Sequence, residues 1–444
     1  MSNYSVFANL LDEYLTRRER SGAWLAQRLH INPATVSRWR NGDSRPGSPE
    51  VVVQMADLLQ ISAHDCAQML AAIGYAAAPM PTPNRSGEYP VGLTPVARGQ
   101  SSPTAIWQHY PPDYCYREMR TIAHWIDIGA SGIVLGLPGS GVSTLLRYLS
   151  HRSEVLSDYL VGHKLVVPIW LELQPMAEPV PTTIYRLFLR GLLTQSAQLP
   201  TVITADLRHS CQSALRDTDL FVLQTWLFTL IEHFQRAQIT LLFAFDRTDA
   251  LPPETQMAVG TNLRLIRDQF RETVLYLMGM RRRATYFEDS NQLGELGSLL
   301  SLNLCVVRGL TEKDSLFTIG RRTALAGKTP STQDVEHFLA LTGGYPSLLK
   351  GVIQWWLTTA PPSPHQQWQP RLLREPGIQY HLREIWRALA PAERMALQTL
   401  QHHRNGQALS PEASEELARL GLLCRADDDW QFAGSLFTGL TDHG

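Results

Sequence analysis

The chain has 444 residues, 44% of them hydrophobic, and a formal net charge of −1 at pH 7. This length favours two to four domains, and the near-neutral charge excludes bulk attraction to nucleic acid or to an anionic membrane, so any DNA binding must come from a local surface. The five cysteines include no CxxC pair, which indicates free thiols in a reducing compartment. There is no signal-peptide pattern and no apolar run of about 18 residues, so we expect a cytoplasmic protein with no membrane partner.

Residues 1–75 are predicted to form an all-α head. The spacing of apolar residues predicts helices over 6–20, 22–30, 33–41, 48–59 and 63–73. We expect Asn32 to cap the third helix, with Pro33 at its first position and Gly42 stopping it. Val36 and Trp39 are three residues apart and should face a small core.

This head resembles the phage-repressor or Cro-like (XRE) helix-turn-helix domains. The resemblance is carried by Leu25, Ala26, Ile31, Val36, Ser37, Trp39, Asn41, Gly42 and Pro46. It implies that the third helix lies in the major groove of double-stranded DNA. The side chains then expected toward bases are Asn32, Ala34, Thr35 and Arg38, and those expected toward phosphates are Ser37, Arg40, Asn41 and Arg45.

Two features keep a second interpretation open. Gly22 stands where these domains often carry a glutamine, and acidic residues in the head roughly balance the basic ones. A helix-turn-helix retained for docking a protein is the alternative. Since one such domain makes few base contacts, DNA reading by this head also implies self-association elsewhere in the chain.

Residues 76–105 are predicted to be a linker. They contain prolines at 79, 81, 83, 90, 95 and 103 among Gly, Ser and Ala, and no helical or strand period.

A glycine-rich stretch, Gly136-Leu-Pro-Gly-Ser-Gly-Val-Ser-Thr144, follows an apolar strand and opens a helix. That order is typical of a phosphate-binding loop, in which backbone N–H groups and a helix N-terminus surround a polyphosphate. Val142 replaces the lysine of the GxxxxGK[ST] pattern, and a charged hydrogen bond of this kind contributes roughly 1.5–3 kcal/mol. The candidate nucleotide-binding residues here are Gly136, Gly139, Ser140, Gly141, Val142, Ser143 and Thr144. An ordinary Gly-rich turn is the alternative.

Further apolar runs at 165–171, 239–246, 274–278 and 304–307 predict a five-stranded parallel sheet within residues 106–310. Asp246 ends one strand, where its carboxylate and the Ser143 hydroxyl would lie beside Mg²⁺ carried by a nucleotide. The next residue, where a catalytic acid is expected, is Arg247. Asp249 is two residues further on and need not point at the γ-phosphate.

The span 106–358 resembles a STAND-type AAA+ NTPase. The resemblance is carried, in order, by Arg117-Glu118, the glycine-rich loop, Asp246, Arg281 and Gly344-Tyr345-Pro346, although Tyr116 replaces a glycine of the family pattern. It implies that Arg281 contacts the γ-phosphate and that Pro346 packs on adenine. The alternatives are a solvated charge cluster at 281–283 and a helix start with proline at its first position.

A helical lid is expected at 311–358, a second proline-rich linker at 359–377, and three helices followed by a hairpin at 378–444. The last pattern is similar to the winged helix that follows the lid in STAND proteins. Asp427 and Asp429 would repel DNA phosphates, so we expect the winged helix to clamp the nucleotide domain.

The predicted fold is therefore multidomain: a helix-turn-helix head, an α/β P-loop core, a helical lid and a winged-helix tail. We expect a DNA-binding regulator whose STAND-like domain binds ATP or ADP with Mg²⁺ as a switch, and in which no catalytic residue supports efficient hydrolysis. The alternative is an assembly switch in defence or transposition, with the head as a partner-docking or target-DNA module.

Overall fold

The computed structural model describes residues 4–17, 20–29, 31–46, 49–59, 61, 69, 72–73, 106–162, 165–173, 181–195, 201–217, 219–251, 253–281, 303–359, 365–402, 409–426 and 429–443. The chain divides into two compact units, Met1–Ala97 and Arg98–Gly444. The boundary falls inside the proline-rich segment 76–105. All of segment 76–105 lies outside the described residues. Two other parts of the predictions also do: the acidic residues 427 and 428 of the hairpin and the arginines at 282 and 283.

The first unit contains four described helices: α1 (Ser5–Arg17), α2 (Gly22–Leu29), α3 (Pro33–Arg40) and α4 (Pro49–Leu59). Oδ1 of Asn32 accepts a hydrogen bond from the backbone N–H of Ala34 at 2.9 Å, which caps α3 as expected. Val36 and Trp39 are buried in the core of this unit, which confirms their predicted orientation. Most of the helix expected over 63–73 lies outside the described residues.

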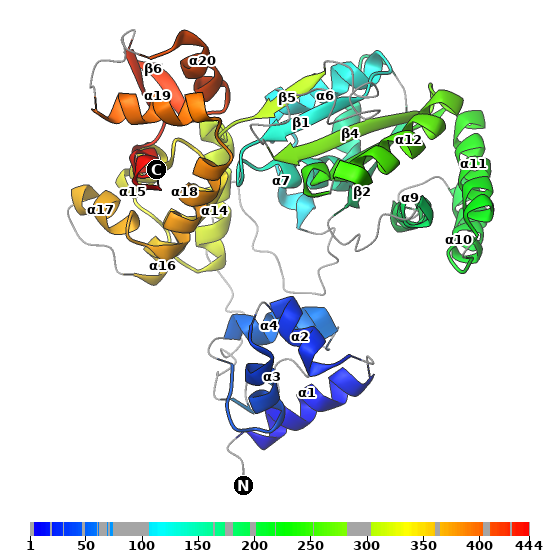
Figure 1. Cartoon of the computed structure of the whole chain (residues 1–444), viewed down its shortest axis with the longest axis horizontal. Coiled ribbons are helices and arrows are strands. Elements are labelled where there is room, and N and C mark those ends of the chain that lie inside the picture. The colour runs from blue at the N-terminus through cyan, green and yellow to red at the C-terminus, as the bar shows by residue number, and fades with distance from the viewer. Residues whose placement is uncertain are drawn as a thin grey trace, which may run out of the picture. The chain divides into compact units, whose positions relative to one another are not determined.

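The second unit is built on a parallel sheet (Figure 1). Its strand order is β2-β3-β4-β1-β5. The strands are β1 (Gly132–Gly136), β2 (Leu165–Glu172), β3 (Ile239–Asp246), β4 (Val274–Arg281) and β5 (Leu304–Val307). The first four are apolar and almost fully buried, as expected of strands covered on both faces. The predicted α/β core with a parallel sheet is confirmed.

Helices cover both faces of this sheet, and alternate residues of each strand therefore pack into two different cores. Ile133 and Leu135 pack with one group of helices, and Val134 packs with the other. On the first face lie α9 (Pro181–Gln195), α10 (Thr201–Ala214), α11 (Leu220–Arg236) and α12 (Pro253–Gln269). On the second lie α6 (Tyr116–Asp127), α7 (Val142–His151) and α8 (Ser153–Ser157).

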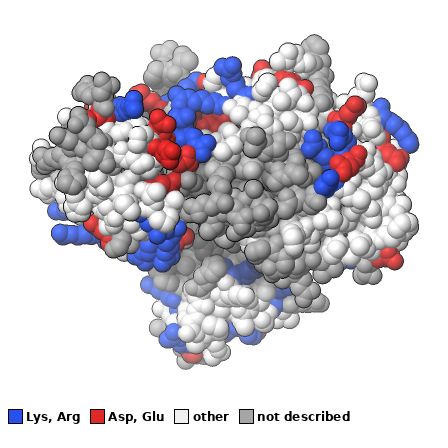
Figure 2. Space-filling view, turned by 45° about the horizontal axis from the view of Figure 1, so that its top comes forward, with Lys and Arg blue, Asp and Glu red and all other residues white. Residues whose placement is uncertain are grey.

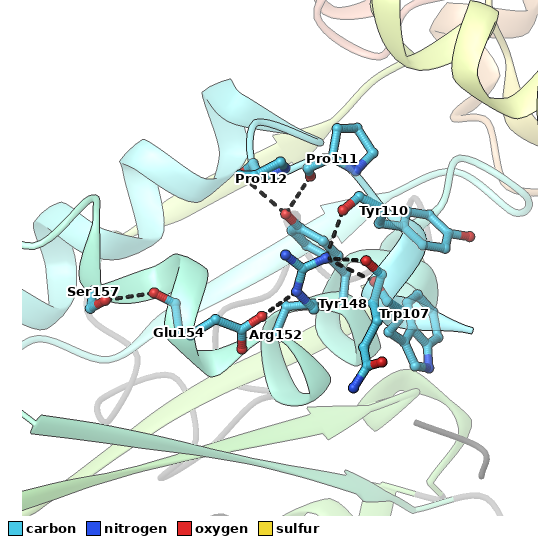
Figure 3. A network of polar contacts seen from close by, with 9 residues as sticks. Trp107, Tyr110, Pro111, Pro112, Tyr148, Arg152, Glu154 and Ser157 are labelled. Atoms are coloured by element: carbon cyan, nitrogen blue, oxygen red, sulfur yellow. Dashed lines mark hydrogen bonds and ion pairs between the residues drawn. The ribbon is translucent and has the colours of Figure 1, made fainter. Parts of the chain in front are cut away.

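The segment that enters the second unit is held against the C-terminal end of α7 (Figure 3). Nη1 of Arg152 donates hydrogen bonds to the carbonyl oxygens of Trp107, Gln108 and Tyr110 at 3.0, 3.2 and 2.6 Å. Tyr148 Oη donates to the carbonyl oxygen of Pro111 at 2.8 Å. The short 3-10 helix Trp107–His109 is therefore fixed to the helix that begins at the glycine-rich loop.

After β5 the chain is mainly helical. The segment expected to form a lid, called the lid below, contains α14 (Glu312–Leu325), α15 (Thr332–Thr342) and α16 (Pro346–Thr358). It is followed by α17 (Trp368–Leu372), α18 (Pro376–Arg387), α19 (Pro391–His402), α20 (Pro411–Arg419), the hairpin β6 (Leu423–Ala426) and β7 (Asp429–Phe432), and the 3-10 segment Ser435–His443.

The stretch 359–377 differs from the expected linker. Residues 365–372 are helical, and Trp368 and Leu372 are buried. Trp368 packs against Phe338 of α15 and Trp355 of α16. Pro370 lies within α17 and Pro376 begins α18, while residues 360–364 lie outside the described residues. The described part of this stretch belongs to the lid core, which continues into α18, α19 and α20.

Candidate functional site

The carboxyl ends of β1, β3 and β4 lie together at one edge of the sheet. Because these strands are parallel neighbours, the residues that follow each strand meet there. Gly136, the last residue of β1, is paired in register with Arg281, the last residue of β4. Asp246 ends β3, on the other side of β4. The sheet therefore brings the glycine-rich loop, Asp246 and Arg281 to one place.

The loop makes a tight turn between β1 and α7. Gly139 has φ +86° and Gly141 has φ +110°, in the left-handed region that favours glycine. Val142 is the first residue of α7, whose ten residues begin immediately after the turn. The unpaired N–H groups and the positive dipole end of this helix favour an anion at the turn.

Ser143 and Asp246 are in direct contact. Oγ of Ser143 donates a hydrogen bond of 2.9 Å to Oδ1 of Asp246, which is 2% exposed. A hydroxyl and a carboxylate are oxygen ligands of the kind that Mg²⁺ takes together with substrate phosphates. In the described part of the chain no group of three or more His, Cys, Asp or Glu could hold a metal ion. These two residues therefore fit Mg²⁺ carried by a polyphosphate better than a metal held by the protein alone.

A cavity of about 430 Å³ opens beside the turn, within the 300–1,000 Å³ range of ligand pockets. From the expected site it includes Gly139, Gly141, Val142, Ser143, Thr144, Asp246 and Arg281. Four cationic side chains line it, Arg247, Arg281, Arg322 and Lys350, against two carboxylates, Asp246 and Asp249. The charge balance favours an anionic ligand.

Val142 and Arg247 are the two residues that depart from the expected P-loop NTPase pattern, and the structure shows where each side chain lies. The side chain of Val142 is buried over the strands, since a Cβ atom placed on Gly136 or on Gly279 would lie 2.9 or 3.2 Å from its methyl groups. Arg247 lines the cavity from a left-handed backbone position, φ +61°. Val142 therefore lacks the ammonium group of the lysine in the pattern, and Arg247 lacks the carboxylate of the acid expected after β3.

The carboxylate of Asp249 is bonded to the backbone at the end of β4. Its Oδ1 accepts a hydrogen bond of 3.1 Å from the backbone N–H of Arg281, and the residue is 3% exposed. This carboxylate fixes the end of β4 to the turn after β3. Asp249 lies three residues beyond Asp246, the last residue of β3.

The lid rests directly on the glycine turn. The backbone N–H of Ser347 donates to the carbonyl oxygen of Gly139 at 3.2 Å, and Tyr345 Oη donates to that of Pro138 at 3.0 Å. Pro346 packs on Gly141, where its Cγ would lie 3.6 Å from an added Cβ. Among the residues expected at the site, Gly136, Ser140 and Pro346 are not part of the described lining of the cavity.

Ser140 borders a second cavity of only about 20 Å³, roughly the space of one water molecule, and Gly141 lines both cavities. It is also lined by Arg117, Glu118 and Asp314. Burial raises the pKa of Glu118, a hydrogen bond from its own backbone lowers it, and the charge of Asp314 raises it, so the net shift is upward. Burial is also the main cause of the raised pKa of Asp314, whose Oδ2 accepts a hydrogen bond of 2.8 Å from Thr311.

Residues contributed by the lid and tail were missed in the sequence. Besides Arg322 and Lys350, the cavity includes Ser347, Gly351 and Gln354 of α16 and His381 of α18. Residues 347, 350, 351 and 354 follow helical spacing, and they form the polar stripe of an otherwise apolar helix. That stripe is the signal that could have identified them.

In the N-terminal unit the expected DNA-contacting residues fall into two groups. Ala34, Ser37, Arg38 and Asn41 are exposed, and Thr35 is half-buried. Two arginines expected on phosphates have partners within the unit. Arg40 Nε donates to Oδ1 of Asp12 at 2.7 Å, and Arg45 donates to the carbonyl oxygen of Ile73. On the face of the molecule shown in Figure 2, Lys and Arg are interspersed with Asp and Glu.

A scan against models of known protein families finds no match to this chain, and a search of curated proteins also finds none. Solved structures similar to the chain include the Walker-type ATPase of Pyrococcus abyssi, with 14% identity over 73% of this chain and 95% of that one, at a TM-score of 0.42. The Aeropyrum pernix ORC1 protein in complex with DNA is 14% identical over 77% and 94%, at 0.38. The ORC2 protein of the same organism, in ADPNP and ADP complexes, is 13% identical over 74% and 92%, at 0.38. With TM-scores below 0.5, these similarities carry no argument about what the chain binds.

None of the described helices has the length and apolar character needed to cross a membrane.

Proposed function

We propose that this protein is a DNA-binding transcriptional regulator in which a P-loop domain binds ATP or ADP as a conformational switch. The nucleotide part rests on one observation. A single cavity gathers the glycine turn, the Ser143–Asp246 pair and four cationic side chains. A polyphosphate with Mg²⁺ matches the backbone donors, the oxygen ligands and the charge of this cavity.

We further propose that hydrolysis is weak or absent. Phosphoryl transfer depends on positive charge at the transferred phosphate and on a group that orients the attacking water. Val142 removes the first contribution from the loop, and Arg247 replaces the acid that would make the second. The carboxylate of Asp249 is engaged with the backbone of Arg281.

The DNA-binding part rests on α3. Its exposed residues Ser37 and Arg38 lie on the side opposite the buried Val36 and Trp39, as in a helix that presents one face to a groove. In the proposed switch, nucleotide state sets the position of the lid and of the winged-helix tail, and thereby self-association. Each further head in an oligomer then binds DNA at high effective concentration.

Titration calorimetry of the full chain with ATP, ADP and Mg²⁺ tests the nucleotide part. We expect saturable binding and a turnover far below the roughly 1–100 s⁻¹ that is typical of kinases. Absence of binding at millimolar nucleotide would overturn the nucleotide proposal. Turnover comparable with an intact P-loop enzyme would overturn the claim of weak hydrolysis and leave binding intact.

Electrophoretic mobility shifts with genomic fragments test the DNA part. Arg38→Ala and Thr35→Ala should reduce sequence preference, at roughly 1–3 kcal/mol per lost base contact. Arg28→Ala is the matched control, because it removes the same charge from an exposed position on α2. If Arg38→Ala and Arg28→Ala behave alike, the assignment of α3 to the groove is wrong.

A second candidate is an assembly switch in which the head docks a protein. The pairs Arg40–Asp12 and Arg45–Ile73 favour it, because both arginines are already engaged within the unit. Light scattering with and without ATP discriminates the two. Nucleotide-dependent assembly by a protein that shifts no genomic fragment supports this candidate. A transposase or nuclease gene next to this one would also favour it.

A further inference from the structure

The lid contributes cations to the cavity that the glycine-rich loop lacks. Lys350 lies on α16, one helical turn after Ser347, whose N–H is bonded to Gly139. Arg322 lies on α14, and both side chains line the cavity that contains Ser143 and Asp246. Two lid helices thus direct positive charge to the space beside the phosphate-binding turn.

Lys350 and Arg322 are not paired with carboxylates of the protein in its described part. Across the described residues, neither Lys350 nor Arg322 forms an ion pair with an Asp or Glu. The charges that act on Lys350 are both positive. Burial, followed by the charges of Arg322 and Arg321, lowers the pKa of Lys350. Burial, followed by Arg321, lowers that of Arg322.

Convergence of like charges in a partly buried place is unfavourable unless an anion joins them. The nearby His381 does not relieve it, because burial and the charge of Lys350 lower the pKa of that imidazole. The carboxylates of Asp246 and Asp249 line the same cavity, but they accept hydrogen bonds from Ser143 and from the backbone of Arg281. The positive charge of Lys350 and Arg322 therefore favours a ligand that carries several negative charges.

We propose that Lys350 and Arg322 supply to the phosphate chain of a bound nucleotide the positive charge that Val142 has removed from the loop. This inference rests on the proposed nucleotide binding. It adds that the phosphates bridge the core and the lid, since the glycine turn belongs to one and the two cations to the other. Nucleotide binding would then draw α14 and α16 onto the loop through the ligand itself.

Titration calorimetry of the full chain with ATP, ADP and adenosine tests this inference. Lys350→Gln and Arg322→Gln should each weaken ATP and ADP binding by roughly 10- to 100-fold, the effect of losing one charged hydrogen bond, and should leave any adenosine binding unchanged. Arg383→Gln is the matched control. It removes an exposed cation from α18, the helix of His381, and should change affinity less than twofold.

A rescue separates a charge effect from a packing effect. Lys350→Arg keeps the charge and should retain most of the affinity. Adding Val142→Lys to Lys350→Gln returns a cation to the loop and should recover at least tenfold of the lost affinity. Thermal unfolding should show that ligand-free Lys350→Gln is at least as stable as the unmodified protein, because repulsion is removed, while its stabilisation by ADP is smaller.

The outcomes distinguish the two levels of the proposal. The role of the lid cations is wrong if nucleotide binds equally tightly to Lys350→Gln, Arg322→Gln and Arg383→Gln. That result would leave the proposed nucleotide binding unaffected. A Lys350→Gln variant that is unstable without ligand, yet is stabilised by ADP as much as the unmodified protein, would also contradict it. If the unmodified protein binds neither nucleotide, both proposals fail.

Discussion

Oγ of Ser143 lies 2.9 Å from Oδ1 of Asp246, although 103 residues separate the two in the chain. The contact exists because β1 and β3 run parallel on either side of β4, so the loop after one strand reaches the carboxylate at the end of the other. It joins the two halves of the proposed Mg²⁺–phosphate site in a single hydrogen bond.

Ser143→Ala should destabilise the second unit and weaken Mg²⁺-dependent nucleotide binding. It leaves the carboxylate of Asp246 buried without this donor, a loss of about 1–3 kcal/mol. Chemical denaturation measures the stability, and calorimetry with and without Mg²⁺ measures the binding. Ser213→Ala, at an exposed position on α10, is the control. Equal stability of the two variants would show that the hydrogen bond contributes nothing.

Gly139→Ala should release the lid from the loop. The new methyl group would meet Ser347 Oγ at 2.3 Å, and alanine is strained at φ +86°. We expect a loss of more than about 1 kcal/mol of stability and faster hydrogen exchange at the start of α16. Gly320→Ala is the contrasting control. An added Cβ there meets nothing within 4 Å, and in helix α14 the change should stabilise by about 0.5–1 kcal/mol.

Glu118→Gln should stabilise the protein near pH 7 and have little effect near pH 4. Burial raises the pKa of Glu118 in the folded state, and Asp314 adds to this effect, so the folded protein binds the proton more tightly than the unfolded chain does. The stability that this proton contributes is present below the ordinary glutamate pKa and is lost as pH rises through the raised value. Thermal unfolding of both proteins across pH 4–8 measures it. A stability difference that grows toward acid pH would contradict the sign.

Arg152→Ala should loosen the segment that enters the second unit. The guanidinium donates to three carbonyl oxygens and is 11% exposed, so its loss should cost about 1.5–3 kcal/mol and increase proteolysis near residues 106–112. Arg236→Ala removes an exposed partner of Glu232 on α11, and a change within about 0.5 kcal/mol is expected. Unchanged proteolysis in Arg152→Ala would contradict the anchoring role.

Much of the core could be predicted from the sequence because its signals are local. The four long strands are continuous apolar runs, and the glycine spacing identifies the turn between β1 and α7. Asp246 and Arg281 are found from their positions at strand ends. α8 and α10 were missed, because α8 has only five residues and α10 begins after a proline among polar residues without a strong apolar period.

The remainder depends on contacts between distant segments. The prolines at 361–376 predicted a linker, but Trp368 and Leu372 are held in the lid core, where Trp368 contacts Phe338 of α15 and Trp355 of α16. The role of Lys350 depends on where α16 lies against Gly139, which no local pattern reports. Pro346 matched its family motif, and in the structure it packs on Gly141 of the glycine turn without being among the described residues that line the larger cavity.

The shared core of lid and tail has a mechanical consequence. Phe338, Leu382, Leu397, Leu417 and Phe437 belong to one continuous set of buried side chains, so α14 through the C-terminal 3-10 segment form a single stiff arm. The 3.2 Å hydrogen bond between Ser347 and Gly139 ties that arm to the glycine turn. Both ends of the hairpin β6–β7 lie close to this junction, since a Cβ atom on Gly343 would meet the carbonyl oxygen of Ala433 at 2.5 Å and one on Gly421 would meet the N of Gly309 at 3.1 Å. A shift of the lid would therefore carry the tail with it as one rigid body.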